Sequence, residues 1–141
     1  MLSRLMLFAI VTLLFCTVST ALAETVSAKI SIASQTMTVY VNDAPVHTWP
    51  VSTARRGYTT PLGNYAPYWL SKNHRSKAYN NAPMPYAVFF LRGYAVHGTT
   101  DVKALGRPAS HGCVRLLTEN ARTFYELVER SGKKNVSIVV E

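Results

Sequence analysis

One histidine and one cysteine in the C-terminal half of this sequence could together perform nucleophilic catalysis. His97 begins the segment His97–Thr100, and Cys113 lies in the motif Ser110-His111-Gly112-Cys113-Val114-Arg115. A cysteine attacks as its thiolate, and a neighbouring imidazole can take the thiol proton. We therefore predict that Cys113 is a nucleophile, that His97 is its general base, and that this pairing lowers the pKa of the thiol.

A general base must itself be held by a partner on its second ring nitrogen. No acidic residue is adjacent to His97, so the backbone carbonyl of Gly98 is the predicted partner. The carboxylate of Asp101 is the weaker alternative.

The residues around Cys113 could supply the other groups that acyl transfer requires. A tetrahedral intermediate needs hydrogen-bond donors aimed at its oxyanion, and Gly112 allows a tight backbone that points the amides of Gly112 and Cys113 inward. Arg115 could bind a substrate carboxylate through two parallel hydrogen bonds. Ser110 is expected to satisfy nearby backbone groups, and His111 to hydrogen-bond the loop rather than to act as the base.

A zinc site is the alternative chemistry for the same residues. His97, His111 and Cys113 have side chains that bind zinc, and three ligands would leave one coordination position open. The sequence has no obvious carboxylate base near this cluster, so we predict no metal and no cofactor.

The N-terminus predicts that the protein is exported. Arg4 precedes an almost continuous apolar run over residues 5–18, and Ala21-Leu22-Ala23 has the small-x-small pattern of a cleavage site. This is the order of a secretory signal peptide, whereas a membrane anchor needs about 20 apolar residues. We predict a signal peptide at 1–23 and one domain at 24–141, located in the periplasm or cell wall, with no integral membrane segment after cleavage.

Export makes the cysteine count informative. Cys16 lies inside the predicted signal peptide, so Cys113 is the one cysteine of the predicted mature chain and has no internal disulfide partner. A free thiol in an oxidising compartment is either functional or packed in the core, and the count alone leaves both possibilities open.

The charge of the chain separates two classes of partner. The formal net charge is +8, and removal of Arg4 leaves +7. A strongly basic exported protein is attracted to anionic surfaces such as lipid headgroups or cell-wall carboxylates. The basic residues are scattered along the chain and form no single run, so nucleic acid is not an expected partner.

The fold that must position these residues is predicted to be mainly β. Alternating or β-branched segments predict strands at 28–32, 36–41, 46–51, 64–66, 86–91, 94–97 and 135–140. The polar, basic segment 67–81 is predicted to be a long exposed loop, and loops of that size are often functional.

One helix is predicted over residues 119–130. Four apolar side chains share one face at helical spacing: Ala121, Phe124, Tyr125 and Val128. Thr118 is the predicted N-cap, and Gly132 is expected to end the helix. The elements together predict a largely antiparallel β domain with one helix packed on it.

The motif around Cys113, preceded by His97-Gly98, resembles the signature of L,D-transpeptidase catalytic domains, the YkuD family. Two further segments resemble that family: Thr60-Pro61-Leu62-Gly63-Asn64-Tyr65, and Met84-Pro85-Tyr86 followed by Phe89-Phe90 and Gly93. The resemblance extends over residues 28–140 and implies an antiparallel β-sandwich with one packed α-helix.

The resemblance also implies an enzyme that exchanges peptide bonds in peptidoglycan. The cysteine of such an enzyme attacks the amide after the third residue of a stem tetrapeptide, releases D-alanine and passes the acyl group to an amine. A stem-peptide amine gives a 3–3 cross-link, and a lysine of a lipoprotein anchors that protein to the wall. Transfer to water would instead make the enzyme a carboxypeptidase or endopeptidase. The alternative from a different functional class is a protein that binds the cell wall without catalytic activity.

Carried onto this sequence, the resemblance implies that Cys113 is the nucleophile and His97 the base. His111 and Gly112 would line the oxyanion site with Cys113, Arg115 would contact the substrate, and Tyr86 would line the donor pocket. Some members have a serine where this chain has Gly98, so here that residue can contribute only its backbone. The sequence leaves the acceptor and the oligomeric state open.

Overall fold

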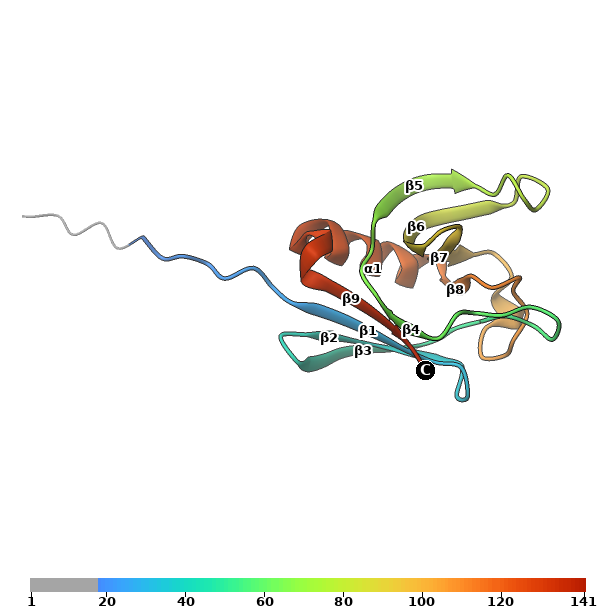
Figure 1. Cartoon of the computed structure of the whole chain (residues 1–141), viewed down its shortest axis with the longest axis horizontal. Coiled ribbons are helices and arrows are strands. Elements are labelled where there is room, and N and C mark those ends of the chain that lie inside the picture. Colours follow the sequence, from blue (N-terminus) through green and yellow to red (C-terminus); the bar gives the residue numbers. More distant parts are fainter. Residues whose placement is uncertain (1–17) are drawn as a thin grey trace, which may run out of the picture.

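A computed structural model describes residues 18–141, which form two β-sheets and one long helix (Figure 1). Residues 1–17, and with them most of the predicted signal peptide, lie outside the described residues. Residues 18–25 extend away from the domain without regular secondary structure (Figure 1). In the stretch 18–141, no helix has the length and apolar character needed to span a membrane.

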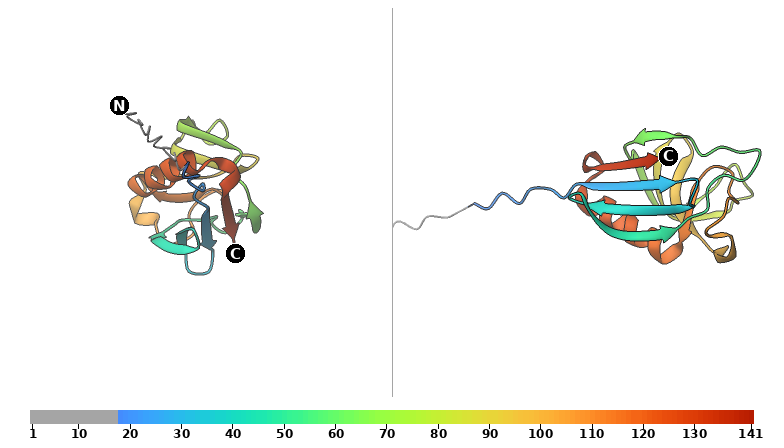
Figure 2. Two further views of the ribbon diagram at one scale, coloured as in Figure 1. Left: turned by 90° about the vertical axis from the view of Figure 1, so that its left-hand side faces the viewer. Right: turned by 90° about the horizontal axis from the view of Figure 1, so that it is seen from below.

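The first sheet has five strands in the order β3-β2-β1-β9-β4. Their bounds are β1 Val26–Ser31, β2 Thr36–Val41, β3 Ala44–Pro50, β4 Gly63–Tyr65 and β9 Val136–Val140. In β1, Val26, Ala28 and Ile30 are buried while Lys29 is exposed, because side chains alternate between the two faces of a strand. The right-hand view of Figure 2 shows these strands side by side.

The second sheet has four strands in the order β5-β6-β7-β8. Their bounds are β5 Trp69–Arg75, β6 Pro83–Leu91, β7 Tyr94–Thr99 and β8 Val114–Leu117. The prediction of a loop over residues 67–81 is therefore wrong for Trp69–Arg75, which form strand β5 and pair with β6. No residue of β5 is buried, so this edge strand lacks the alternation by which a strand is recognised in a sequence.

Each sheet contains one parallel pair of strands, which the prediction of a largely antiparallel domain did not include. β1 runs parallel to β9 in the first sheet, and β7 runs parallel to β8 in the second. The prediction of a mainly β domain with one packed helix is confirmed, and the parallel pairs make both sheets mixed.

The helix α1, Thr118–Ser131, packs against β6, β7 and β8. Its buried face includes the four predicted apolar residues, and Gly132 ends it with φ of 82°. Leu117, not Thr118, occupies the N-cap position. The hydroxyl of Thr118 instead donates a hydrogen bond to the carbonyl of Thr99 at 3.2 Å, which ties the helix start to the end of β7.

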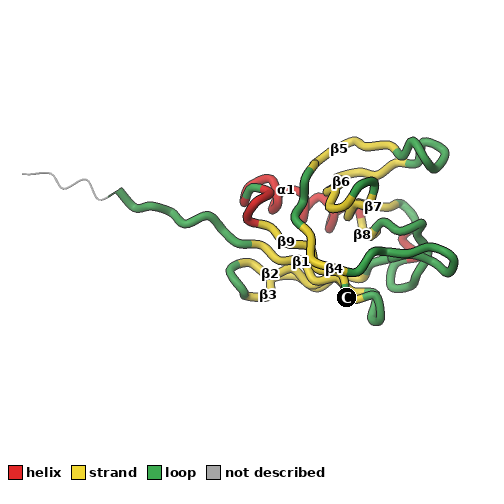
Figure 3. The backbone as a smooth tube through the Cα atoms, in the orientation of Figure 1, coloured by secondary structure: helices red, strands yellow, loops and turns green. Residues whose placement is uncertain are grey.

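The second sheet carries buried apolar residues on both faces. One face joins α1 and the first sheet in the main core, to which β6 contributes Val88 and Phe90. The other face carries a smaller apolar cluster of Met84, Ala87, Phe89 and Ala95, against which Cys113 packs. Figure 3 shows the long loops gathered at the end of the domain away from the N-terminal segment, and this end holds the candidate site.

Candidate active site

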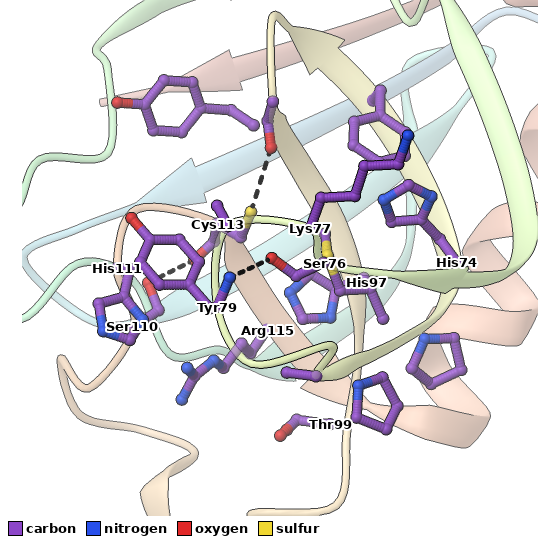
Figure 4. A pocket seen from close by; sticks show the side chains of 18 of the residues that line it. His74, Ser76, Lys77, Tyr79, His97, Thr99, Ser110, His111, Cys113 and Arg115 are labelled. Carbon is purple, nitrogen blue, oxygen red and sulfur yellow. Dashed lines mark hydrogen bonds between the residues drawn. The ribbon is translucent and has the colours of Figure 1, made fainter.

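The parallel pairing of β7 and β8 brings the two predicted catalytic residues to one face of the second sheet. His97 lies opposite Arg115, and Cys113 directly precedes β8, two residues before Arg115. Residues two apart on a strand share a face, so Cys113, Arg115 and His97 point the same way. All three line one cavity of about 990 Å³ (Figure 4).

The imidazole of His97 is held in one tautomer. Its Nδ1 lies 2.7 Å from the carbonyl oxygen of Gly98, which can only accept, so Nδ1 carries the proton and Nε2 is unprotonated. This is the hydrogen bond expected from the sequence. His97 is 6% exposed, and burial lowers its pKa from 6.5 to about 4, against the opposing effect of the Gly98 hydrogen bond. The positive charges of Arg115 and His74 contribute smaller parts of this lowering of the pKa.

The thiol of Cys113 lies beside the turn between β6 and β7. Its Sγ is 3.6 Å from the carbonyl oxygen of Gly93. Burial raises the pKa of the thiol, while the amide of Ala95 and the charge of Arg115 lower it by less. The expectation of a lowered pKa is therefore wrong. The apolar cluster beneath the sulfur disfavours the thiolate, so the resting pair is a neutral thiol and a neutral imidazole.

The loop before Cys113 is fixed by backbone shape and by hydrogen bonds from Ser110. Gly112 has φ of 136°, and a Cβ atom there would lie 2.5 Å from Cε1 of Tyr94. The buried Ser110 hydroxyl donates to the carbonyl of Cys113 at 2.6 Å and accepts from the amide of Gly112 at 3.0 Å. Ser110 thus braces the loop, as expected.

This brace changes the expected oxyanion site. The amide of Gly112 is already bonded to Ser110, so it does not point freely into the cavity. The amide of Cys113 makes no hydrogen bond with other residues of the described chain, 18–141. Of the two predicted donors, Cys113 is the one left available for an oxyanion.

Thr60 supports the same loop and was not identified as a site residue from the sequence. Its buried hydroxyl donates to the carbonyl of Gly112 at 2.8 Å and accepts from the amide of Ala54 at 3.0 Å. The one feature of the sequence that could have identified Thr60 is its position at the start of the segment Thr60–Tyr65, which resembles the family.

His111 belongs to the wall of the cavity. Its ring stacks on Tyr79 at 4.1 Å and meets Tyr58 edge-on at 4.7 Å. Arg55 donates to Nε2 of His111 at 3.1 Å, so that nitrogen is an acceptor. Partial burial, followed by the charges of Arg55 and Arg115, lowers the pKa of His111. These contacts agree with a supporting role for this residue rather than that of the base.

Arg115 is a half-buried cation without a partner for its side chain among residues 18–141. Its backbone is fixed by a reciprocal pair of hydrogen bonds with Ser52, at 2.9 and 3.0 Å. The cavity is also lined by Lys77 and Arg92, and Asp101 is the one carboxylate among its described lining residues. The cavity therefore has an excess of positive charge that suits an anionic ligand.

Gly98 contributes only its backbone, as expected, whereas Tyr86 lies elsewhere than expected. Gly98 leaves no room for a side chain, because a Cβ atom would lie 2.9 Å from Cα of Thr118. Tyr86 does not line the cavity. Its φ of 53° interrupts the alternation of β6 and turns its ring toward α1, where it packs on Tyr125 at 5.7 Å.

The hairpin of β5 and β6 supplies cavity residues that the sequence analysis placed in a loop. His74 and Tyr79 are two of them. Both belong to the β5–β6 hairpin, whose curved strand β5 is seen in Figure 1. For the zinc alternative, no three His, Cys, Asp or Glu side chains within 18–141 converge as metal ligands would.

Comparison with known proteins places this chain in a family. Residues 25–139 match the YkuD family, described as the L,D-transpeptidase catalytic domain. The Escherichia coli K12 protein named "Probable L,D-transpeptidase YbiS" is 30% identical over 138 residues, which cover 76% of this chain and 44% of that protein. This chain spans between 44% and 63% of the length of the first two curated relatives it matches.

Solved structures agree with the sequence relatives. An L,D-transpeptidase from Mycobacterium tuberculosis H37Rv superimposes with a TM-score of 0.75 at 26% identity, covering 84% of this chain and 58% of that one. An L,D-transpeptidase from Stackebrandtia nassauensis gives a TM-score of 0.72 at 26% identity, covering 83% and 55%. The chain therefore belongs to the YkuD family of L,D-transpeptidase catalytic domains.

Proposed function

We propose that this protein is a peptidoglycan L,D-transpeptidase in which Cys113 is the nucleophile and His97 the general base. The observation that supports this most is the neutral imidazole of His97, with Nε2 unprotonated, lining the same cavity as the thiol of Cys113. The excess of cationic side chains in that cavity favours a donor that carries carboxylates, as a stem tetrapeptide does.

In the first half-reaction, Nε2 of His97 takes the thiol proton as the sulfur attacks the carbonyl carbon after the third stem residue. The amide of Cys113 donates to the oxyanion. The carbon–nitrogen bond then breaks, the imidazolium returns its proton to the leaving nitrogen, and D-alanine departs. A thioester acyl-enzyme remains. Because both resting groups are neutral, the thiol proton must pass to His97 before or during the attack.

In the second half-reaction, an amine attacks the thioester. His97 takes the proton of the attacking nitrogen, the carbon–sulfur bond breaks, and the proton returns to sulfur. Arg115 contacts a substrate carboxylate in this scheme. The acceptor is a stem-peptide amine, which gives a 3–3 cross-link, or the lysine of a wall-anchored lipoprotein.

The test is to incubate the enzyme with a stem tetrapeptide, with and without a diaminopimelate-containing tripeptide as amine acceptor, and to weigh the products. Transfer predicts a cross-linked product that appears only with the acceptor and not with Cys113→Ala. Free tripeptide as the sole product under both conditions would identify a hydrolase, which uses the same acyl-enzyme. No product and no carbapenem adduct would favour a non-catalytic wall-binding module.

We further propose that the protein acts outside the cytoplasm after removal of residues 1–23. The support is the order of Arg4, the apolar run and Ala21-Leu22-Ala23 in the sequence. Intact-mass measurement of protein recovered from the cell envelope should give a chain that begins at Glu24. A chain that retains Met1 would contradict this proposal.

A further inference from the structure

Three aromatic side chains of the second sheet form a cluster on the wall of the catalytic cavity. Trp69 stacks on Phe89 with centroids 4.7 Å apart and an interplanar angle of 22°. His74 meets both rings edge-on, at 5.3 Å from Trp69 and 4.9 Å from Phe89. All three residues line the cavity that contains Cys113.

The cluster presents a rigid but exposed indole. Phe89 is 3% exposed and covers one face of the Trp69 ring, whereas Trp69 itself is 46% exposed. The adjacent Tyr68 is fixed at both ends: its hydroxyl donates to the carbonyl of Arg92, and its own carbonyl accepts from Lys133 at 2.8 Å. A large aromatic surface held in one orientation and left open to water is a preorganised binding surface.

The chemistry of this surface favours a sugar over an apolar peptide. The face of an indole is electron-rich, and the electron-poor C–H groups on one side of a pyranose can lie flat against it. The cavity is also lined by the cations Arg92 and Lys77, which can donate hydrogen bonds to hydroxyl and acetamido oxygens. The stem tetrapeptide of the proposed donor has no large apolar side chain that would match an indole.

We propose that Trp69 and its supporting cluster bind an amino sugar of the glycan strand to which the donor stem peptide is attached. The identity of this ligand rests on the proposed function. The surface would hold the glycan while the peptide reaches Cys113, so binding energy from the sugar would position the reacting amide.

A second aromatic pair in the chain provides a matched control. Trp49 stacks on His47 at 4.6 Å and 18° in β3, on the first sheet, and neither residue lines the catalytic cavity. If stacking of a tryptophan on a neighbouring ring served only to stabilise a strand, truncation of either tryptophan should have similar effects on catalysis.

The kinetic test uses two donors with the same peptide, a disaccharide tetrapeptide and the sugar-free tetrapeptide. We expect the wild type to prefer the disaccharide donor by about tenfold in kcat/KM. Trp69→Ala should reduce that preference to within about twofold, Trp69→Phe should retain part of it, and Trp49→Ala should leave it unchanged. Equal losses on both donors with Trp69→Ala, or no preference in the wild type, would overturn the proposal.

A binding test covers the case in which neither donor reacts, which would contradict the proposed function instead. Trp49 and Trp69 are the two tryptophans of the sequence, so Trp49→Phe leaves Trp69 as the single indole reporter. In the double variant Trp49→Phe/Cys113→Ala, the disaccharide tetrapeptide should change the indole fluorescence in a saturable way. The sugar-free tetrapeptide should bind at least about fivefold more weakly. Equal affinities would overturn the glycan assignment.

Discussion

The two sheets differ in where non-glycine residues with positive φ and buried titratable side chains occur. In the first sheet, the non-glycine residues with positive φ (Gln35, Asn42 and Asp43) all lie in turns. In the second sheet, Tyr86 has φ of 53° within β6, and His97 is buried with its imidazole neutral.

This difference separates stability from chemistry. The first sheet buries one face in the core, so close packing constrains which residue types can occupy that face. The second sheet has a core face and a catalytic face, so it carries polar groups and backbone strain that packing alone would not select. Substitutions in the two sheets should therefore have opposite effects on activity and stability.

The largest effect is expected at Cys113. Cys113→Ala should reduce kcat/KM for a tetrapeptide donor by at least about 10⁴-fold. The free energy of unfolding should change by less than about 1 kcal/mol, because the side chain is half-buried and small. The measurements are donor turnover, urea unfolding and the mass of a carbapenem adduct. An adduct formed equally well by the variant would disprove the nucleophile assignment.

The reverse pattern is expected in the first sheet. Ile30 is fully buried in β1, so Ile30→Ala should lower the free energy of unfolding by about 2–5 kcal/mol. The kcat/KM per folded molecule, measured by active-site titration with a carbapenem, should stay within about twofold of wild type. Val46→Ala, an exposed site in β3, is the control and should change stability by less than about 0.5 kcal/mol.

Two glycines with positive φ should differ in the cost of adding a side chain. Gly112→Ala should cost about 3 kcal/mol of stability and most of the activity, because its Cβ would meet Tyr94 at 2.5 Å and the carbonyl of Thr59 at 2.9 Å. Gly132→Ala has the same backbone problem, but the nearest atom lies 3.8 Å away, so a cost of about 1 kcal/mol is expected. Normal turnover in Gly112→Ala would show that the loop tolerates displacement.

Acid should destabilise the protein through His97. Its pKa is 6.5 when unfolded and about 4 when folded. Above pH 6.5 the imidazole is neutral in both states, and as the pH falls toward 4 the unfolded state binds a proton that the folded state excludes. Stability should therefore fall by about 3 kcal/mol over this range. Urea unfolding of His97→Gln at pH 8 and pH 4 should lack this loss, and an unchanged loss would contradict the assignment.

The smallest effect is a selective one at Arg115. If its guanidinium binds a substrate carboxylate, Arg115→Gln should lower kcat/KM by about 10- to 100-fold for a donor with a free terminal carboxylate. The same donor with a terminal carboxamide should be affected by less than about threefold. Arg107→Gln removes an exposed cation outside the cavity and is the control. Equal losses on both donors would indicate a structural role instead.

Much of the first sheet could be predicted because its signals are local. The alternation in β1 and β2, the turn at Asn42-Asp43 and the β-branched strand β9 are all visible in short segments of sequence. β5 and β8 could not be predicted in the same way. β5 has a polar, basic sequence without apolar alternation, and β8 lies between the Cys113 motif and α1 with no turn to mark it, so pairing with distant neighbours determines both.

The site shows the same limit. The sequence indicated Cys113 and His97 because of the chemistry of their side chains. It indicated the carbonyl of Gly98 because Gly98 directly follows His97 in the chain. It did not indicate that Ser110 occupies the amide of Gly112, or that Tyr86 turns away from the cavity. Both depend on backbone geometry that no residue type specifies alone.

The reactive groups of this protein and its mainly β character can be inferred from the amino-acid sequence alone. The protonation states of these groups depend on the folded structure. The sequence motif suggested an ionised sulfur, but the apolar cluster under Cys113 and the burial of His97 make the neutral forms the stable ones. The physical reason is desolvation, which depends on all the residues that surround a group and therefore becomes defined only when the strands have packed.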